Sequence, residues 1–413
     1  ENGFITLPGT ELWFQQAGNS KVSGGEVYGH KNMYFFADNE KLATLTLTAS
    51  QFNKDDGTAT RVADCDEIWT IVEEMEKSFG DILLLPHHPA GHGPLNTAWA
   101  CHNPTHTPSA EVYSQHGNSM QLNPDFDPLG APGSYKEGGS IDNAIHPALH
   151  GYKLGFFSST DNHSTIPGGV CSLDNTDYAM RYGGGLAVVM LDTATSFTRQ
   201  SIFKALVDRK TYATSGPMLP VKVTYAVAGE VYGEMGDILS IPSGQTIDMT
   251  LRIPEDYVAH VTHITVRQPD MTSGEKGLWF ETEMSYAAHG TWTASFTDPP
   301  PVLYPTIHID GDSWYGKGKC NDGGANNLEM VWVSPTWFDT TSDTDGTDTG
   351  TEPETQSTND TSPSDTETGL NTDGKSSACS GCAANTFPLS LAHLVLLIPV
   401  VFVLRRSKDT IEA

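Results

Sequence analysis

The sequence predicts an α/β domain with a mainly parallel sheet or barrel, then an antiparallel β-sandwich, an acidic stalk and one transmembrane helix. Three observations carry this prediction. Short apolar runs alternate with helical patterns in residues 1–218, apolar and polar residues alternate one by one in 219–338, and an acidic stretch leads into an apolar run in 339–413. The 413 residues include 40 Gly and 25 Pro, which favours a loop-rich architecture over a helical bundle.

The first domain, residues 1–218, is expected to begin inside an incomplete fold. Its strand-like run at 4–7 has no lead-in and the first residue is Glu1, so we expect upstream sequence to be missing. Alternating strands and helices of this kind are typical of βα units with parallel strands. The expected strands are 4–7, 34–36, 82–85, 111–114, 154–158 and 186–190. The expected helices are 66–78, 144–152 and 197–209, the last capped by Thr198 or Ser196.

The second domain, residues 219–338, has the period-two pattern of half-buried strands. The runs at 221–227, 247–253 and 264–267 alternate apolar and polar side chains and are separated by turn residues. Antiparallel sheets with one face on a core show this pattern. We therefore expect a β-sandwich.

The C-terminal part is expected to attach the protein to a membrane. Residues 339–378 are poor in apolar side chains and predict a disordered acidic stalk, because such a segment cannot form a core. Residues 387–404 are apolar and long enough to span a hydrocarbon layer of about 30 Å as a helix. Basic residues follow, which predicts a cytoplasmic tail and an extracytoplasmic body at the cell surface. These are Arg405, Arg406 and Lys408.

The order of these tail features resembles the C-terminal sorting tails of myxobacterial and related surface proteins. The features are the stalk, the Cys379–Cys382 motif, the apolar segment and the Arg pair in 379–413. The resemblance implies a sorting protease that acts at the Cys motif and removes the helix. A permanent single-span anchor is the alternative.

The net charge indicates which partners to expect, and the cysteine content indicates which disulfides are possible. The formal net charge is −28, so we expect no nucleic-acid partner, since phosphate recognition needs clustered Lys and Arg. Four cysteines lie in the body and allow two disulfides with three connectivities. They are Cys65, Cys101, Cys171 and Cys320.

Histidines and carboxylates gather after the expected strands of the first domain. Ten of the 15 histidines lie between residues 30 and 163. The carboxyl ends of parallel strands meet on one face of an α/β fold, where these side chains would converge. Imidazole and carboxylate groups bind Zn, Mn or Fe ions. The segments are 7–11, 28–32, 85–89, 111–117 and 157–163, and together they predict a site for divalent metal ions.

The order of these motifs resembles the polymerase and histidinol phosphatase (PHP) superfamily, and in particular an uncharacterised branch of it. The motifs are Glu, Gly-His, Pro-His-His-Pro, Glu-x-x-x-x-His-Gly and Ser-x-Asp-x-His, with further similarity at 183–189 and 202–216. The resemblance covers about residues 1–338. It implies a distorted β/α barrel whose C-terminal mouth carries a di- or trinuclear metal site that activates water to hydrolyse a phosphate ester or another small molecule.

The resemblance also assigns roles to individual residues. His116 is either a ligand or a bystander, and His30 is expected to line the site. The implied metal ligands are Glu11, His87, His88, His116, Asp161 and His163, of which Glu11, Asp161 and His163 are also implied to be catalytic. The expected substrate-binding residues are His30, Arg181 and Arg209, although both arginines also have structural explanations. The remaining histidines of this region, His92, His102, His106, His146 and His150, are interpreted as structural or surface residues.

One departure from the family pattern leaves the function open. The superfamily's first motif, His-x-His, is absent from this chain, and it would lie upstream of Glu11. The leading hypothesis is a surface-displayed, metal-dependent hydrolase of phosphate esters, in the complete protein. The alternatives are hydrolysis of a different bond and a non-catalytic surface binding module that retains the fold.

Overall fold

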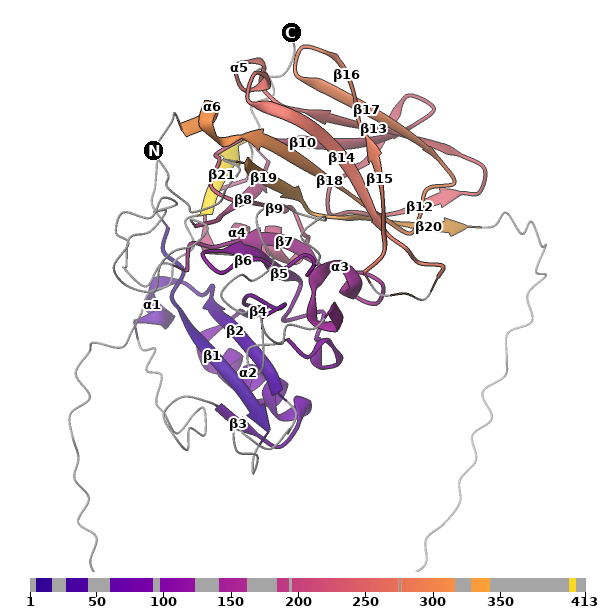
Figure 1. The fold of residues 1–413 in the computed structure, drawn as a ribbon. Helices are drawn as coiled ribbons and strands as arrows, with labels where there is room; N and C mark the ends of the chain where they lie inside the picture. The colour runs from indigo at the N-terminus through magenta and orange to yellow at the C-terminus, as the bar shows by residue number, and fades with distance from the viewer. Residues whose placement is uncertain are drawn as a thin grey trace, which may run out of the picture. The chain divides into compact units, whose positions relative to one another are not determined.

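The fold consists mainly of β-strands, as the computed structural model shows (Figure 1). All elements described below belong to one unit by their contacts. The structure describes residues 5–16, 27–43, 60–91, 97–122, 141–161, 184–192, 195–273, 275, 277–315, 328–341 and 401–405.

The prediction of a β/α barrel is wrong. The described strands form open sheets with no closed barrel among them, and the sheet that opens the chain is largely antiparallel. The misinterpretation has a physical origin, because β4 (Ile82–Pro86), β5 (Ser109–Ser114) and β7 (Gly155–Ser158) are buried on both faces. Such strands have continuous apolar runs in any sheet that is covered on both sides, whatever the direction of their neighbours.

The first sheet has the strand order β3-β1-β2-β4. β1 (Gly9–Gln16) and β2 (Val27–Phe35) are antiparallel, β2 pairs antiparallel with β4, and β3 (Thr60–Val62) pairs parallel with β1. The strand predicted at 4–7 therefore begins later, at Gly9, although Leu7 is buried in a core cluster. The short helix α1 (Asn39–Leu42) follows β2.

Helix α2 (Cys65–Phe79) covers one face of this sheet and matches its predicted position. Asp64 caps its N-terminus by accepting a hydrogen bond from the Glu67 N–H, and Gly80 ends it with φ of 76°. Its buried side chains recur every three or four residues, as an amphipathic helix requires, and pack in one core cluster with β1, β2 and β4. They are Ile68, Trp69, Val72 and Met75.

The second sheet has the order β6-β5-β7, and β5 and β7 run parallel. β6 (Gly117–Asn118) pairs antiparallel with β5. Three short helices lie between β4 and β7 along the chain: 3-10 helices at Trp99–Cys101 and Ile141–Asn143, and the α-helix α3 (Ile145–Ala148). Helix α3 is shorter than the predicted helix 144–152.

The third sheet has nine strands and crosses the expected domain boundary at 218. Its main path is β12-β20-β18-β19-β9-β8-β21, with β14 paired to β18 and β15 to β14. Helix α4 (Arg199–Val207) connects β8 to β9, and Thr198 forms its capping box, as expected. The strand bounds are β8 (Leu186–Leu191), β9 (Thr211–Thr214), β12 (Ile238–Pro242), β14 (Val261–Pro269), β15 (Trp279–Glu283), β18 (Val302–Asp310), β19 (Leu328–Val333), β20 (Thr336–Thr341) and β21 (Val401–Arg405).

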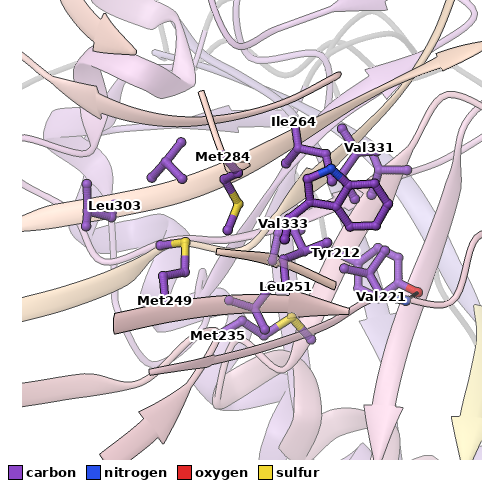
Figure 2. Close-up of a cluster of buried hydrophobic side chains, with 14 of the residues drawn as sticks. Tyr212, Val221, Met235, Met249, Leu251, Ile264, Met284, Leu303, Val331 and Val333 are labelled. Atoms are coloured by element: carbon purple, nitrogen blue, oxygen red, sulfur yellow. Dashed lines mark hydrogen bonds between the residues drawn. The ribbon is translucent and has the colours of Figure 1, made fainter. Parts of the chain in front are cut away.

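The fourth sheet, β11-β10-β13-β17-β16, shares a hydrophobic core with the third. Figure 2 shows this core, where Met249 and Leu251 from β13 lie near Ile264 from β14 and Val331 from β19. The period-two pattern correctly predicted the strands near 221–227, 247–253 and 264–267. The bounds are β10 (Lys222–Val227), β11 (Glu230–Glu234), β13 (Thr246–Arg252), β16 (Ser285–Ala288) and β17 (Thr291–Thr297), with the short helices α5 (Glu255–Val258) and α6 (Gly311–Tyr315).

The predicted transmembrane helix is not supported. Within the described part of the chain, no helix is long and apolar enough to span a bilayer. The last four residues of the apolar run and the following Arg405 form the strand β21 (Val401–Arg405), which pairs parallel with β8. The tract is rich in Val and follows Pro399, a composition that favours a strand over a continuous helix. The rest of 387–404, the Cys motif and nearly all of the stalk lie outside the described residues.

Candidate metal centre

The candidate centre lies where several strands end. His87 and His88 follow β4, Glu111 lies in β5, and Asp161 comes three residues after β7. β5 and β7 are parallel, so their carboxyl ends meet at one edge. The β1–β2 hairpin is held beside them because the His87 N–H donates to the His30 carbonyl at 3.1 Å.

Two groups of potential ligands share one imidazole. His87, His88 and Asp161 form the first group, and Glu11, His30 and His88 form the second. Within each group, the ligand atoms lie within 4.8 Å of one another. The ring centroids of His87 and His88 are 4.0 Å apart, and those of His30 and His88 are 5.0 Å apart. The shared His88 makes the two groups one continuous cluster.

Glu111 fixes the orientation of His87. The His87 Nδ1 atom lies 2.8 Å from Glu111 Oε1, and both side chains are almost fully buried. An ionised carboxylate only accepts hydrogen bonds, so this contact places a hydrogen on Nδ1. His87 Nε2 then faces Asp161, 3.5 Å from its Oδ2. Protein metal sites use the same carboxylate–histidine arrangement to orient a ligating imidazole.

The Glu111 carboxylate has two further donors. The His88 backbone N–H donates to Oε1 at 3.2 Å, and the Ser159 hydroxyl donates to Oε2 at 2.6 Å. One buried carboxylate therefore ties together the segments after β4 and β7. This is a costly side chain to bury unless it is fully hydrogen-bonded, and here it is.

Two residues of the centre adopt left-handed backbone conformations. His88 has φ of 31° and Asp161 has φ of 48°, and both are nearly fully buried. Non-glycine residues seldom adopt such conformations, which cost on the order of 1–3 kcal/mol each and cluster at functional sites. Both residues also contribute ligand atoms to the cluster.

The electrostatic environment holds the two adjacent imidazoles in different protonation states. Burial opposes the charged form of His87, but the Glu111 and Asp161 carboxylates hold the pKa of His87 well above its usual range, so a metal ion would displace a proton from His87 on binding. Burial, and then the neighbouring His87, His30 and His116, hold the pKa of His88 well below its usual range. Burial opposes ionisation of Glu11, but its hydrogen bond with His30 and the nearby His87 hold its pKa below the usual value. A neutral imidazole lone pair and ionised carboxylates are the ligand forms that bind divalent cations.

The floor of the site includes a phenol that the sequence analysis did not single out. Tyr34 lies on β2, and its pKa is raised by burial and then by the Glu111 and Glu11 carboxylates. Its hydroxyl is buried, and a hydrogen bond with the Asn32 side chain partly opposes the rise in its pKa. The hydroxyl and the Asn32 amide thus lie side by side near the carboxylates of the centre.

The other predicted site residues divide into three sets. His116 Nε2 lies 2.8 Å from Asp161 Oδ2, so it contacts the cluster, although it belongs to neither ligand group. His163 and Arg181 lie outside the described residues. Arg209 packs near Gly155 at the start of β7, donates to the Gly236 carbonyl and lies over Trp337. Arg209 is therefore at the end of β7 opposite Asp161.

The histidines interpreted as structural have structural contacts where they are described. His106 stacks on Trp69, and His146 lies 2.6 Å from the Tyr304 hydroxyl. His102 packs against Tyr152, and His150 is exposed. His92 lies outside the described residues.

Glu111 is the main residue for which sequence reasoning gave no role. It appeared in a recognised motif, yet only His116 was assigned from that motif. The available signal was a carboxylate inside the apolar strand 109–114, because acidic side chains are almost never fully buried unless paired. Ser159 gave no comparable signal.

The donor set fits a divalent metal ion. It offers three imidazoles and two carboxylates, of which His87, His88 and Asp161 are buried and Glu11 and His30 are partly exposed, and Glu111 orients His87 by a hydrogen bond. Comparison of the chain with family models, characterised proteins and solved structures gave no match. The resemblance to the PHP superfamily thus stays a prediction. One of the possible disulfides, Cys65–Cys101, is present, while Cys171 and Cys320 lie outside the described residues.

Proposed function

We propose that the protein is a metal-dependent hydrolase that acts on phosphate esters. The observation that carries the proposal is the pair of ligand groups that share His88, one with His87 and Asp161 and the other with Glu11 and His30. Divalent cations bound there would supply Lewis acidity and lower the pKa of a coordinated water, the chemistry that hydrolases of this kind use.

Individual side chains have distinct roles in this proposal. His88 would hold a divalent cation either with His87 and Asp161 or with Glu11 and His30, because a neutral imidazole has one lone pair and ligates one cation at a time. Glu111 keeps His87 in the orientation that directs Nε2 toward Asp161. The Tyr34 hydroxyl donates a hydrogen bond to an oxygen of the substrate or of water, since a phenol is both buried and neutral in this setting.

Hydrolysis of a generic aryl phosphate with added Mn²⁺ or Zn²⁺ tests the proposal. Asp161→Asn should reduce activity by at least about a hundredfold, because the amide removes a charge and presents an N–H₂ donor where the cation needs a lone pair. His150→Asn is the matched control, since His150 is exposed and outside the cluster, and it should retain activity.

Two results would change the proposal in different ways. Wild-type activity and metal content in Asp161→Asn would remove Asp161 from the site and overturn the mechanism. Stable binding of metal without cleavage of any phosphate ester would keep the metal centre and reject the substrate class.

A further inference from the structure

The hairpin loop between β5 and β6 lies against Asp161. Ser114 and Gly117 pair directly across the hairpin, so the loop contains only Gln115 and His116. The Gln115 side-chain amide donates to the Asp161 carbonyl, and His116 Nε2 lies 2.8 Å from Asp161 Oδ2. One tight turn therefore contacts both the main chain and the side chain of a residue in the candidate centre.

Gln115 holds the peptide groups on both sides of Asp161. Its backbone N–H donates to the Thr160 carbonyl at 3.4 Å, and its Nε2 atom donates to the Asp161 carbonyl. The Thr160 carbonyl belongs to the peptide group that precedes Asp161, and the Asp161 carbonyl belongs to the one that follows. Gln115 is only 5% exposed, so water does not compete freely for these hydrogen bonds.

These hydrogen bonds act on a strained residue. Asp161 has φ of 48°, and non-glycine residues keep such a left-handed conformation only where the surrounding structure imposes it. The φ and ψ angles of a residue describe how its two flanking peptide groups are oriented. Because Gln115 holds both groups, it opposes relaxation of Asp161 to an extended conformation, in which the carboxylate would leave the main chain in a different direction.

We propose that Gln115 is a positioning residue of the metal centre, which holds the Asp161 backbone so that its carboxylate lies with His87 and His88 in one ligand group. Gln115 is not itself a ligand, because its amide is directed at the main chain. The inference rests on the proposed function, since it needs a cation bound by Asp161. Removal of the Gln115 amide should therefore weaken metal binding although no ligand is lost.

The zinc affinity of the metal-free full chain, measured by competition with a chromophoric chelator, tests this role. Gln115→Met keeps nearly the length and volume of the side chain but removes the amide donor. It should bind Zn²⁺ at least about tenfold more weakly than the wild type, as outer-shell changes at known sites do. Gln115→Leu should show the same loss, and urea titration checks that both variants fold.

Gln121→Met is the matched control. Gln121 is 3% exposed, and its Nε2 atom also donates to a backbone carbonyl, that of Gly277 at 2.8 Å, but Gln121 belongs to neither ligand group. Gln121→Met should lose about as much stability to urea as Gln115→Met, because each removes one donor from a buried carbonyl, and it should keep wild-type zinc affinity. A merely structural role for Gln115 predicts equal zinc affinity in the two variants.

Three outcomes would count against the inference. A zinc affinity within about threefold of the wild type in folded Gln115→Met or Gln115→Leu would overturn it and leave the proposed function standing. An equal loss of affinity in Gln121→Met would also overturn it, since general destabilisation would then explain both variants. A wild type that binds no Zn²⁺ would overturn the proposed function together with this inference.

Discussion

Replacing Glu111 by Gln tests how the centre holds His87. Gln has nearly the shape of Glu, and its carbonyl oxygen can take the place of Oε1, which accepts from His87 Nδ1 at 2.8 Å and from the His88 N–H at 3.2 Å. Its N–H₂ group would face Ser159, whose hydroxyl can rotate to accept. We therefore expect the variant to fold. Its hydrogen bonds from His87 Nδ1 and from the His88 N–H would then end on a neutral amide oxygen instead of a negatively charged carboxylate oxygen.

The magnitude follows from those two bonds. A hydrogen bond to a charged group contributes about 1.5–3 kcal/mol and a neutral one about 0.5–1.5 kcal/mol, so the loss is about 2 kcal/mol for the pair. That free energy corresponds to about a thirtyfold weaker metal affinity, within the range of about 10–100-fold for outer-shell changes at known sites.

Competition with a chromophoric chelator measures this affinity, and circular dichroism checks the fold. Glu255→Gln is the matched control, because Glu255 also pairs with a histidine, His289, at 2.7 Å, but at an exposed position. The control should leave metal affinity unchanged. An affinity within about threefold of the wild type in Glu111→Gln would refute the claim that Glu111 orients a metal ligand.

Two further predictions concern stability. Reduction of Cys65–Cys101, or Cys65→Ala, should lower the free energy of unfolding by about 3–4 kcal/mol, because the bridge closes a loop with a sequence separation of 36; urea titrations with and without reductant measure this, and equal midpoints would contradict it. Burial lowers the pKa of His146 to about 3, below the usual value of 6.5. As the pH falls, His146 is therefore protonated in the unfolded chain before it is protonated in the folded chain. The folded state keeps its full stability relative to the unfolded state above pH 6.5 and loses part of it as the pH falls toward 3. Between pH 7 and pH 5, His146 should contribute about 2 kcal/mol to the loss of stability in urea unfolding. His146→Gln should therefore lose about 2 kcal/mol less than the wild type, while His102 and His308, whose pKa values burial lowers to about 4 and about 3, contribute in both proteins; the same pH dependence in both proteins would contradict it.

Local patterns in the sequence predicted the elements whose signals are local. Helix α2 has a capping Asp64, an amphipathic period and a terminal Gly80, and it lies where expected. The strands of 219–338 alternate every second residue and were also found. The prediction of a barrel was wrong because local patterns do not determine which strands pair or in which direction. Strand pairing depends on contacts between residues far apart in the sequence. The continuous burial of β4 and β7 hid that information, since both faces of each strand are covered.

The candidate centre could be predicted in part for a similar reason. His87, His88 and Asp161 follow apolar strands, and the carboxyl ends of neighbouring strands do converge here. The place of His30 depends on the antiparallel β1–β2 hairpin, which brings its Nδ1 atom to 3.0 Å from Glu11 Oε1. The role of Glu111 depends on a hydrogen bond across 24 positions of the chain.

Diffraction from crystals of the complete chain soaked in Mn²⁺ or Zn²⁺, collected at the metal absorption edge, tests the central claim most directly. The account predicts strong anomalous density within coordination distance, about 2.0–2.2 Å, of His88 and of at least one carboxylate, from Asp161 or Glu11. Anomalous density confined to surface histidines, with none beside His88 at saturating metal, would contradict it.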